Sequence, residues 1–439
     1  MKRQFEEKLM KWKNNGMKKP LMVIGTRQTG KTYIIEEFIK ENYEEYLIFN
    51  IEKNEAVRNI FENTIDDEEI IRELELYLNK KIDIDKTIIF FDEVQISERL
   101  ITSLKYFCES PKPYKIICAG SLLGVKLERF KGSFPVGKVH IEYMYPLNFE
   151  EFLIACGKEM LRDKIKECFN LMSPIPEFAH KEALKLYREY LCIGGMPEAV
   201  NNFINNEQDV LKFDNSILND IKLSYIADMN KHIENKSESI KIETVYNSIP
   251  KQLAKENKNF QYTILEENAR GRKYKSPIEW LIASKIVLMA KKINKVQDPL
   301  KTFEDDKTFK LYLSDIGLLT NITNIRFNQI MLDEDFIFKG VITENYVAQE
   351  LASKEISLYY WESDGNAKVD FLISTDDGII PIEVKSGINN RSKSLNVYIK
   401  EYNPKYAIRF STRNFGFENN IKSIPLYAVF CIDGDSNAK

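Results

Sequence analysis

The residues best suited to chemistry lie in the stretch 21–32, LMVIGTRQTGKT, where four apolar residues run directly into a glycine-rich loop. A helical pattern, YIIEEFIKENY, follows at once. This strand, loop and helix start are the context in which a phosphate-binding loop works, because glycines let backbone N–H groups point at phosphate oxygens near the positive end of a helix dipole. A flexible Gly/Thr loop is the alternative. We predict that the whole loop binds the phosphates of ATP: Gly25, Thr26, Arg27, Gln28, Thr29, Gly30, Lys31 and Thr32.

An acidic pair has the position needed to act on those phosphates. Asp92 and Glu93 follow an apolar run in TIIFFDEVQ (87–95), which predicts a buried strand. Ligands of open α/β sheets bind at the carboxyl ends of the strands. We expect Lys31 to contact the β- and γ-phosphates, and Thr32 and Asp92 to hold Mg²⁺. Glu93 then has the place of a general base that activates the attacking water.

Strand-like and helix-like segments alternate through the first part of the chain. Apolar runs at 21–24, 46–52, 87–92 and 115–121 are separated by charged, helical stretches. Such runs predict a parallel sheet covered on both faces. Ser121, at the end of the last run, is therefore a candidate catalytic sensor of the γ-phosphate, with a plain turn serine as the alternative.

The composition bounds the class of protein. The length of 439 residues predicts about three domains. A net charge of −3 disfavours attraction of the whole molecule to nucleic acid, so such binding needs a local patch. Six scattered cysteines without a CxxC pair, and three histidines, disfavour a zinc cluster. No apolar leader is visible, and the most apolar later run (278–290) holds Glu279 and Lys285 and is too short to cross a bilayer. The chain is therefore expected to be cytoplasmic and to have no membrane contact.

Several motifs carry a resemblance to a known family. GTRQTGKT, FFDEVQ with its Gln95, and the strand ending AGS resemble the AAA+ P-loop ATPases of the DEXQ kind. YREYLCIGGMPEAV, KLYLSDIGLL, ITENYVAQEL and PIEVKSG are similar, in order, to a large family of bacteria and archaea. Its members join such an ATPase to a C-terminal domain of unknown function that resembles PD-(D/E)xK nucleases.

The resemblance implies an α/β fold with four parts. These are an AAA+ core (1–145) with a parallel sheet of strand order 5-1-4-3-2, a helical lid (146–239), a winged-helix segment (240–325) and a restriction-endonuclease-like α/β domain (326–439). The lid agrees with a helical pattern that Gly194, Gly195 and Pro197 must interrupt by a sharp turn. A homo-oligomer is left open.

A basic stretch precedes the C-terminal domain. Residues 240–300 contain twelve Lys or Arg against six Asp or Glu, and the densest cluster is 270–275. A winged helix with such a cluster would contact the phosphate backbone of nucleic acid, whereas a solvated charged surface is the alternative.

The C-terminal quarter holds a second group of chemically suited residues. Asp376, Asp377 and Gly378 join two strand-like runs, which predicts a hairpin. A turn at 377–378 pairs residue 370 with 385, and a turn at 376–377 pairs 370 with 383. In either register three side chains share one face of the sheet: Asp370, Glu383 and Lys385.

Carboxylates and a lysine arranged in this way suit metal-assisted cleavage of phosphodiesters. Asp370 and Glu383 would bind Mg²⁺, together with Glu344 on an apolar helical stripe, and Lys385 would stabilise developing charge. A solvated hairpin with an ordinary Lys–Glu pair is the alternative. Two positions depart from the family pattern: Lys368, where relatives usually have Glu, and Lys138, where many have Arg. They put metal binding and an arginine finger, respectively, in doubt.

The sequence thus predicts an ATP-binding and ATP-hydrolysing protein whose nucleotide state controls a C-terminal domain that acts on nucleic acid as a metal-dependent nuclease. One alternative is a nucleotide-gated switch with a catalytically inactive C-terminal binding domain. Another, a P-loop that binds ATP but barely hydrolyses it, is disfavoured by Glu93.

Overall fold

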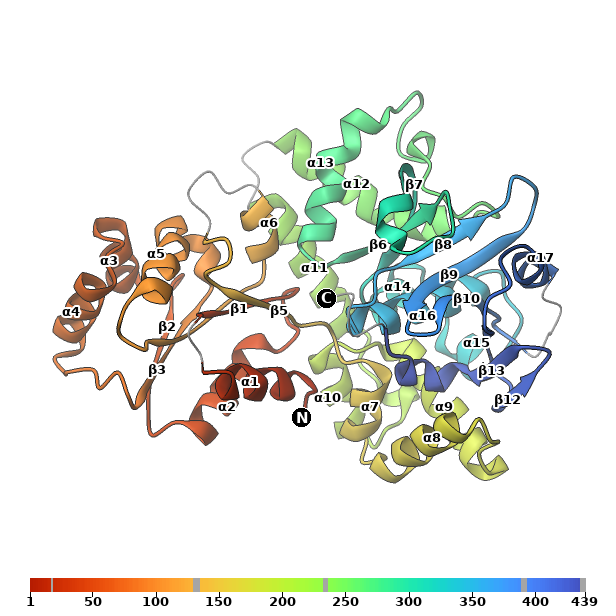
Figure 1. Cartoon of the computed structure of the whole chain (residues 1–439), viewed down its shortest axis with the longest axis horizontal. Coiled ribbons are helices and arrows are strands. Elements are labelled where there is room, and N and C mark those ends of the chain that lie inside the picture. Colours follow the sequence, from red (N-terminus) through yellow and green to blue (C-terminus); the bar gives the residue numbers. More distant parts are fainter. Residues whose placement is uncertain (17–18, 129–134, 232–235, 388–392, 435–439) are drawn as a thin grey trace. The chain divides into compact units, whose positions relative to one another are not determined.

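The computed structural model describes residues 1–16, 19–128, 135–231, 236–387 and 393–434. The chain divides into two compact units (Figure 1). The first comprises Met1–Tyr145 with Ala283–Lys285, and the second Pro146–Ile282 with Ile286–Lys439. The segments predicted as lid, winged helix and C-terminal domain therefore lie almost wholly in one compact unit.

The first unit is built on a five-stranded parallel sheet of order β2-β3-β4-β1-β5, as predicted. Its strands are β1 (Leu21–Ile24), β2 (Glu45–Asn50), β3 (Thr87–Asp92), β4 (Lys115–Gly120) and β5 (His140–Tyr143). Its helices are α1 (Phe5–Asn14), α2 (Lys31–Asn42), α3 (Glu55–Asn63), α4 (Asp67–Leu78), α5 (Glu98–Glu109) and α6 (Leu123–Glu128), with a short 3₁₀ helix η1 (Val94–Ile96).

Two apolar cores cover the two faces of this sheet. Ile88 and Phe90 of β3 pack with α1 and α2 on one face, whereas Ile89 and Phe91 pack with α3, α4 and α5 on the other. Successive side chains of a strand point to opposite faces, so an uninterrupted apolar run fills both cores. The helices on each side are visible in Figure 1.

The second unit combines a helical part with an eight-stranded mixed sheet of order β12-β13-β11-β10-β9-β8-β6-β7. Its strands are β6 (Val287–Ile293), β7 (Glu304–Leu313), β8 (Tyr359–Glu362), β9 (Lys368–Thr375), β10 (Gly378–Val384), β11 (Ala407–Ser411), β12 (Gly416–Glu418) and β13 (Ile421–Pro425). Its helices are α7 (Phe149–Ala155), α8 (Glu159–Leu171), α9 (Glu177–Ile193), α10 (Pro197–Asn205), α11 (Ser216–Lys231), α12 (Lys236–Leu253), α13 (Gly271–Ala283), α14 (Ile316–Ile322), α15 (Phe327–Met331), α16 (Lys339–Ser353) and α17 (Lys393–Tyr402). Short 3₁₀ helices are η2 (Val210–Lys212), η3 (Tyr262–Ile264), η4 (Leu300–Phe303) and η5 (Leu426–Cys431).

The sharp turn predicted inside the helical part is present. Helix α9 ends at Ile193, Gly194 has φ of 74°, and α10 begins at Pro197. Gly195 lies so close to its neighbours that an added Cβ would come within 1.9 Å of the Leu147 carbonyl oxygen. Glycine is required at this approach because any side chain would clash with backbone.

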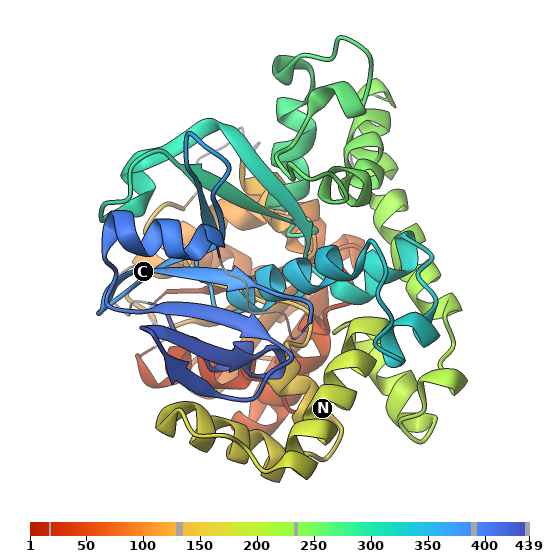
Figure 2. The ribbon, with the colours of Figure 1, turned by 90° about the vertical axis from the view of Figure 1, so that its right-hand side faces the viewer.

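The segment predicted as a winged helix is continuous with the C-terminal sheet. Helices α12 and α13 precede the antiparallel pair β6 and β7. Strand β6 also pairs in parallel with β8, through Lys291 opposite Tyr359. Figure 2 shows the strands of this sheet side by side, with α17 over one face. Leu395 and Tyr398 of α17 pack with Trp361 of β8 in an apolar core.

Candidate functional site

The glycine-rich loop joins β1 to α2 through two glycines whose places are fixed by backbone geometry. Strand β1 ends at Ile24, Gly30 has φ of 88° and ψ of 18°, and α2 begins at Lys31. A Cβ on Gly25 would lie 2.2 Å from the carbonyl oxygen of Met144. Glycine is therefore needed at Gly30 because the backbone there is left-handed, and at Gly25 because a side chain would clash with the backbone of Met144.

The ammonium group of Lys31 is held inside the loop. Lys31 is buried, and its Nζ donates hydrogen bonds to the carbonyl oxygens of Gly25 at 2.9 Å and Thr26 at 2.7 Å. Thr29 Oγ1 also donates to the Thr26 carbonyl oxygen at 2.9 Å. The loop is thus braced internally, with a cation at the place where phosphate charge is expected.

Arg3 supports the loop from outside and was missed by sequence reasoning. Its Nη1 donates to the carbonyl oxygen of Thr29 at 2.9 Å, and its Nη2 donates to that of Tyr145 at 2.7 Å. The only signal in the sequence was an arginine just before an amphipathic helix, and nothing in the spacing links it to the loop.

The two residues predicted to hold Mg²⁺ in this unit are in contact. Thr32 Oγ1 donates a hydrogen bond to Asp92 Oδ2 at 2.9 Å. Burial, and then the neighbouring Glu93, raise the pKa of Asp92, while Thr32 opposes the shift. A hydroxyl and a buried carboxylate beside a phosphate loop are the oxygen ligands that Mg²⁺ prefers, so these residues fit the ion.

The candidate base and sensor lie at the ends of neighbouring strands β3 and β4. Glu93 follows β3 in a left-handed conformation, with φ of 56° and ψ of 40°. Its Oε2 accepts a hydrogen bond from Gln95 Nε2 at 2.5 Å. Ser121 follows β4 and is buried, and its Oγ has no hydrogen-bond partner among the described residues. A buried hydroxyl without a partner leaves a donor for a ligand.

The hairpin of the C-terminal sheet takes the second of the two predicted registers. Thr375 pairs with Gly378 and Phe371 with Ile382, so the turn is Asp376–Asp377. The register with the turn at 377–378 is wrong. In the observed register residues 370 and 383 face each other across β9 and β10.

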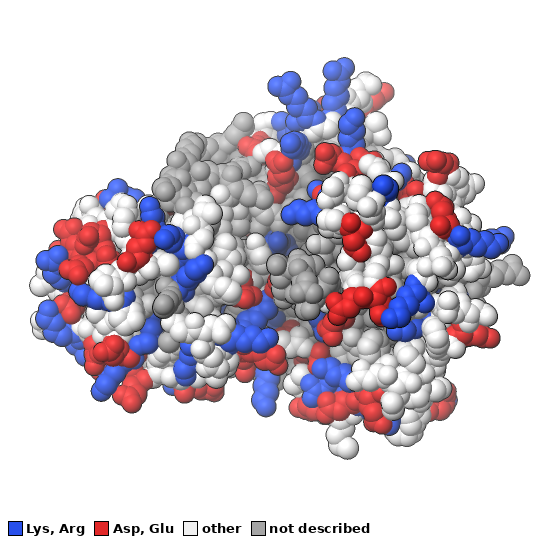
Figure 3. Space-filling model, viewed as in Figure 1, with Lys and Arg blue, Asp and Glu red and all other residues white. Residues whose placement is uncertain are grey.

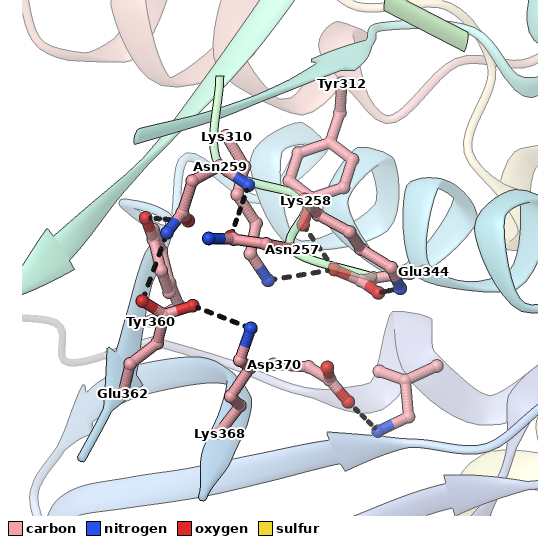
Figure 4. A network of polar contacts seen from close by, with 11 residues as sticks. Asn257, Lys258, Asn259, Lys310, Tyr312, Glu344, Tyr360, Glu362, Lys368 and Asp370 are labelled. Carbon is pink, nitrogen blue, oxygen red and sulfur yellow. Dashed lines mark hydrogen bonds and ion pairs between the residues drawn. The ribbon is translucent and has the colours of Figure 1, made fainter. Parts of the chain in front are cut away.

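Glu344 is contacted by two lysines and a tyrosine (Figure 4). It accepts hydrogen bonds from Lys310 Nζ at 3.1 Å and Tyr312 Oη at 2.6 Å, and it forms an ion pair with Lys258. Burial opposes ionisation of this carboxyl, but Lys258 and Lys310 outweigh burial and lower its pKa to about 2. Neither lysine was predicted to lie here.

Asp370 lies beside this cluster. Its Oδ2 accepts a hydrogen bond from the backbone N–H of Val384 at 2.8 Å. Burial, and then Glu344, raise its pKa to about 6, while Lys310 and Lys258 oppose the shift. We name Lys258, Lys310, Glu344 and Asp370 the lysine–carboxylate cluster.

Glu383 and Lys385 form a separate ion pair. Glu383 Oε1 lies 2.8 Å from Lys385 Nζ, while Glu383 Oε2 is buried without a hydrogen-bond partner among the described residues. Within the described part of the chain, no three His, Cys, Asp or Glu side chains form a group that could hold a metal ion. With Glu344 held by two ammonium groups, the residues present do not fit a divalent ion.

The two departures from the family pattern also have partners. Lys368 Nζ lies 3.5 Å from Glu362 (Figure 4), and Lys138 Nζ lies 3.0 Å from Glu109. Both lysine side chains are 41% exposed.

The basic cluster at 270–275 is partly neutralised. Lys273 forms an ion pair with Glu266, and Lys275 Nζ lies 3.8 Å from Glu279. Arg270 and Arg272 line a hollow of about 370 Å³, together with Glu266, Asn268, Ala269 and Lys273. Figure 3 shows Lys and Arg side chains gathered over the region where α12 and α13 lie in Figure 1.

Comparisons with known proteins place three domain matches along the chain. Residues 17–153 match the family model of an AAA domain. This match, the parallel sheet and the phosphate loop together define the first unit as a P-loop ATPase domain of the AAA type. Residues 184–329 match a domain of unknown function (DUF8612), and residues 339–429 match another (DUF4143).

Among solved structures, two archaeal proteins are similar to this chain. The Walker-type ATPase of Pyrococcus abyssi is 16% identical, with 73% of this chain and 95% of that one covered and a TM-score of 0.45. The ORC2 protein of Aeropyrum pernix is 10% identical, with 77% and 92% covered and a TM-score of 0.39. A search among curated proteins gives no match. Within the described residues, no helix is both long and apolar enough to cross a membrane.

Proposed function

We propose that this protein binds and hydrolyses ATP. The observation that carries the proposal is the hydrogen bond between Thr32 and Asp92, which joins the phosphate loop to the acidic end of β3. Bound Mg²⁺ would neutralise phosphate charge, held by Thr32 and Asp92. Lys31 would exchange the carbonyl oxygens of Gly25 and Thr26 for phosphate oxygens.

Each remaining residue of the site has a role in this reaction. The backbone N–H groups of the loop bind the phosphates at the start of α2. Glu93 accepts the proton of the attacking water, and Ser121 donates its hydroxyl hydrogen to the γ-phosphate. The proposal stands on residue types and on their places at the ends of β1, β3 and β4.

We further propose that the nucleotide state controls how the C-terminal domain acts on nucleic acid. Arg270 and Arg272 support nucleic-acid contact, since they line an open hollow and have a cationic excess around them. Exposed arginines that contact the phosphate backbone bind nucleic acid with little dependence on its sequence.

The lysine–carboxylate cluster favours the second candidate function, a nucleotide-gated switch whose C-terminal domain binds nucleic acid without cleaving it. A metal-dependent nuclease needs Glu344, Asp370 and Glu383 to be available to an ion. Glu344 is instead neutralised by Lys258 and Lys310, so we derive no cleavage step through a metal.

One titration series tests nucleotide control and the binding of nucleic acid, and phosphate release from ATP tests hydrolysis. The full-length protein is mixed with labelled single- and double-stranded DNA and RNA, and anisotropy is followed without nucleotide, with ADP and with a non-hydrolysable ATP analogue. We expect affinity to depend on the nucleotide. Equal affinity in all three states would contradict nucleotide control, and product strands on a gel in Mg²⁺ or Mn²⁺ would contradict the binding-only function.

A further inference from the structure

Gln95 makes a contact that the reaction described above does not use. It lies in η1, directly after β3, and is 8% exposed. A carboxylate only accepts hydrogen bonds, so the 2.5 Å contact with Glu93 Oε2 must be made by the amide nitrogen of Gln95. The amide oxygen therefore points away from Glu93, and it is buried with no hydrogen-bond partner among the described residues.

The end of β4 is shaped to accept this amide. A Cβ added to Gly120 would lie 2.1 Å from Gln95 Oε1 and 3.2 Å from Gln95 Cδ. The backbone of Gly120 has no positive φ, so glycine is required here by space and not by conformation. The missing side chain of Gly120 thus fixes where the amide of Gln95 lies.

We infer that Gln95 is a positioning residue that orients the carboxylate of Glu93 for attack by water on ATP. The inference rests on the proposed ATP hydrolysis. Gln95 occupies one carboxylate oxygen of Glu93, which leaves Oε1 to accept the proton of the water. The Glu93 side chain is partly exposed, and such a side chain has several staggered rotamers open to it. Holding one oxygen restricts that freedom before substrate arrives.

The first experiment replaces the amide by a side chain of similar length that cannot donate a hydrogen bond. Gln95→Met should fold, because it removes a buried oxygen without a partner and keeps an unbranched chain. We expect kcat for ATP hydrolysis to fall about 10- to 100-fold, since a misplaced general base loses catalysis while the phosphate loop is intact. The Kd for a fluorescent ATP analogue should stay within about twofold of wild type.

A double-mutant cycle with Gly120 separates positioning from a general loss of packing. Gly120→Ala should by itself lower kcat, because the new methyl group displaces the Gln95 amide. In a Gln95→Ala background the amide is already gone, so adding Gly120→Ala should change kcat by less than about threefold. Gln297→Leu, which removes an exposed glutamine amide in the second unit, serves as the control and should behave like wild type.

The outcomes distinguish this inference from the proposed function. If the wild-type protein hydrolyses ATP and Gln95→Met has the same or a higher kcat, the positioning role is overturned. A loss of ATP affinity equal to the loss of kcat, or additive effects in the cycle, would also overturn it. A wild-type chain that binds ATP without hydrolysing it would overturn the proposed function, and Gln95 would then have no base to position.

Discussion

The hydroxyl of Thr32 donates a hydrogen bond to Asp92 Oδ2 at 2.9 Å, across 60 positions of sequence. Thr32 stands at the start of α2 and Asp92 at the end of β3. Strand β3 is not adjacent to β1 in the sheet, because β4 lies between them. The contact therefore depends on the strand order β3-β4-β1, and it brings the start of α2 to a buried carboxylate.

Lys31→Ala is expected to abolish ATP binding. The mutation removes the cation that we propose contacts the β- and γ-phosphates, and the backbone N–H groups alone would leave that charge poorly compensated. Affinity for a fluorescent ATP analogue should fall by about 100-fold or more, consistent with the loss of a charge-assisted contact. Lys40→Ala on the same helix is the control, since Lys40 is exposed and its salt-bridge partners among the described residues are Glu36 and Glu37. Wild-type affinity in Lys31→Ala would refute the phosphate-loop assignment.

Glu93→Gln should separate binding from turnover. The amide keeps the shape of the side chain but cannot accept a proton, so we expect ATP to bind while kcat falls by about 100-fold or more. Phosphate release and nucleotide affinity are measured on the same preparation. Glu44→Gln, at a highly exposed position of the first unit, should leave both unchanged. Undiminished turnover in Glu93→Gln would place the base elsewhere.

Glu350 predicts a pH dependence of stability in the second unit. This α16 carboxyl accepts a hydrogen bond from Phe149 N at 2.9 Å, and burial raises its pKa to about 8 from an ordinary 4.5. The folded state binds the Glu350 proton more tightly than the unfolded state does. This proton therefore contributes its full stabilisation of the folded state below about pH 4.5, and the contribution is lost as the pH rises toward 8 and beyond.

We expect Glu350→Gln to be more stable than wild type at pH 8, and we expect this difference in stability to be smaller at pH 6. One proton contributes at most about 1.4 kcal/mol per pH unit to the free energy of unfolding. Thermal midpoints across pH 6 to 8 measure the difference, with the exposed Glu334→Gln as control. Parallel curves for wild type and Glu350→Gln would show that Glu350 does not titrate in this range.

The parallel strands, the phosphate loop and the hairpin were predictable from local signals and spacing, whereas the strand order came from the family resemblance. Apolar runs that end in Gly25, Asp92 and Ser121 mark strands whose carboxyl ends meet at one edge. The hairpin turn had two allowed registers, and only packing selects Asp376–Asp377. In the second unit, Lys258 and Lys310 meet Glu344 from 86 and 34 positions away, and no periodicity in the sequence encodes such a contact.

The basic cluster should bind nucleic acid mainly through its arginines. Because Lys273 and Lys275 are engaged by Glu266 and Glu279, we expect Arg270→Glu with Arg272→Glu to weaken binding more than reversal of the two lysines. Each phosphate contact contributes about −0.9 to the slope of log K against log salt on duplex DNA. The arginine pair should therefore flatten that slope by about 1.8 at most.

Anisotropy titrations at several salt concentrations measure both quantities. Reversal of Lys80 and Lys81, exposed lysines of the first unit, controls for the change in net charge. If affinity and slope stay at the wild-type values in the arginine variant, the cluster is a solvated surface without a role in binding.

Divalent ions should not stabilise the lysine–carboxylate cluster in the wild-type protein. Lys258 and Lys310 already balance the charges of Glu344 and Asp370, so Mn²⁺ would add positive charge where two ammonium groups lie. We expect the thermal midpoint without nucleotide to be unchanged by Mn²⁺. Lys258→Met leaves a buried carboxylate with less compensation, so this variant should be destabilised without metal and raised in midpoint by Mn²⁺.

Asp370→Asn, added to Lys258→Met, tests where the ion binds. If Mn²⁺ occupies the position vacated by the Lys258 ammonium group, removing the Asp370 charge should abolish the gain in midpoint. Lys354→Met, which removes a lysine paired at 3.2 Å with the exposed Asp433, should show no response to Mn²⁺. The expectation would be contradicted if Mn²⁺ raised the thermal midpoint of the wild-type protein and Asp370→Asn removed that increase. Metal would then displace Lys258 unaided, and the nuclease predicted from the sequence would be favoured over the binding-only domain.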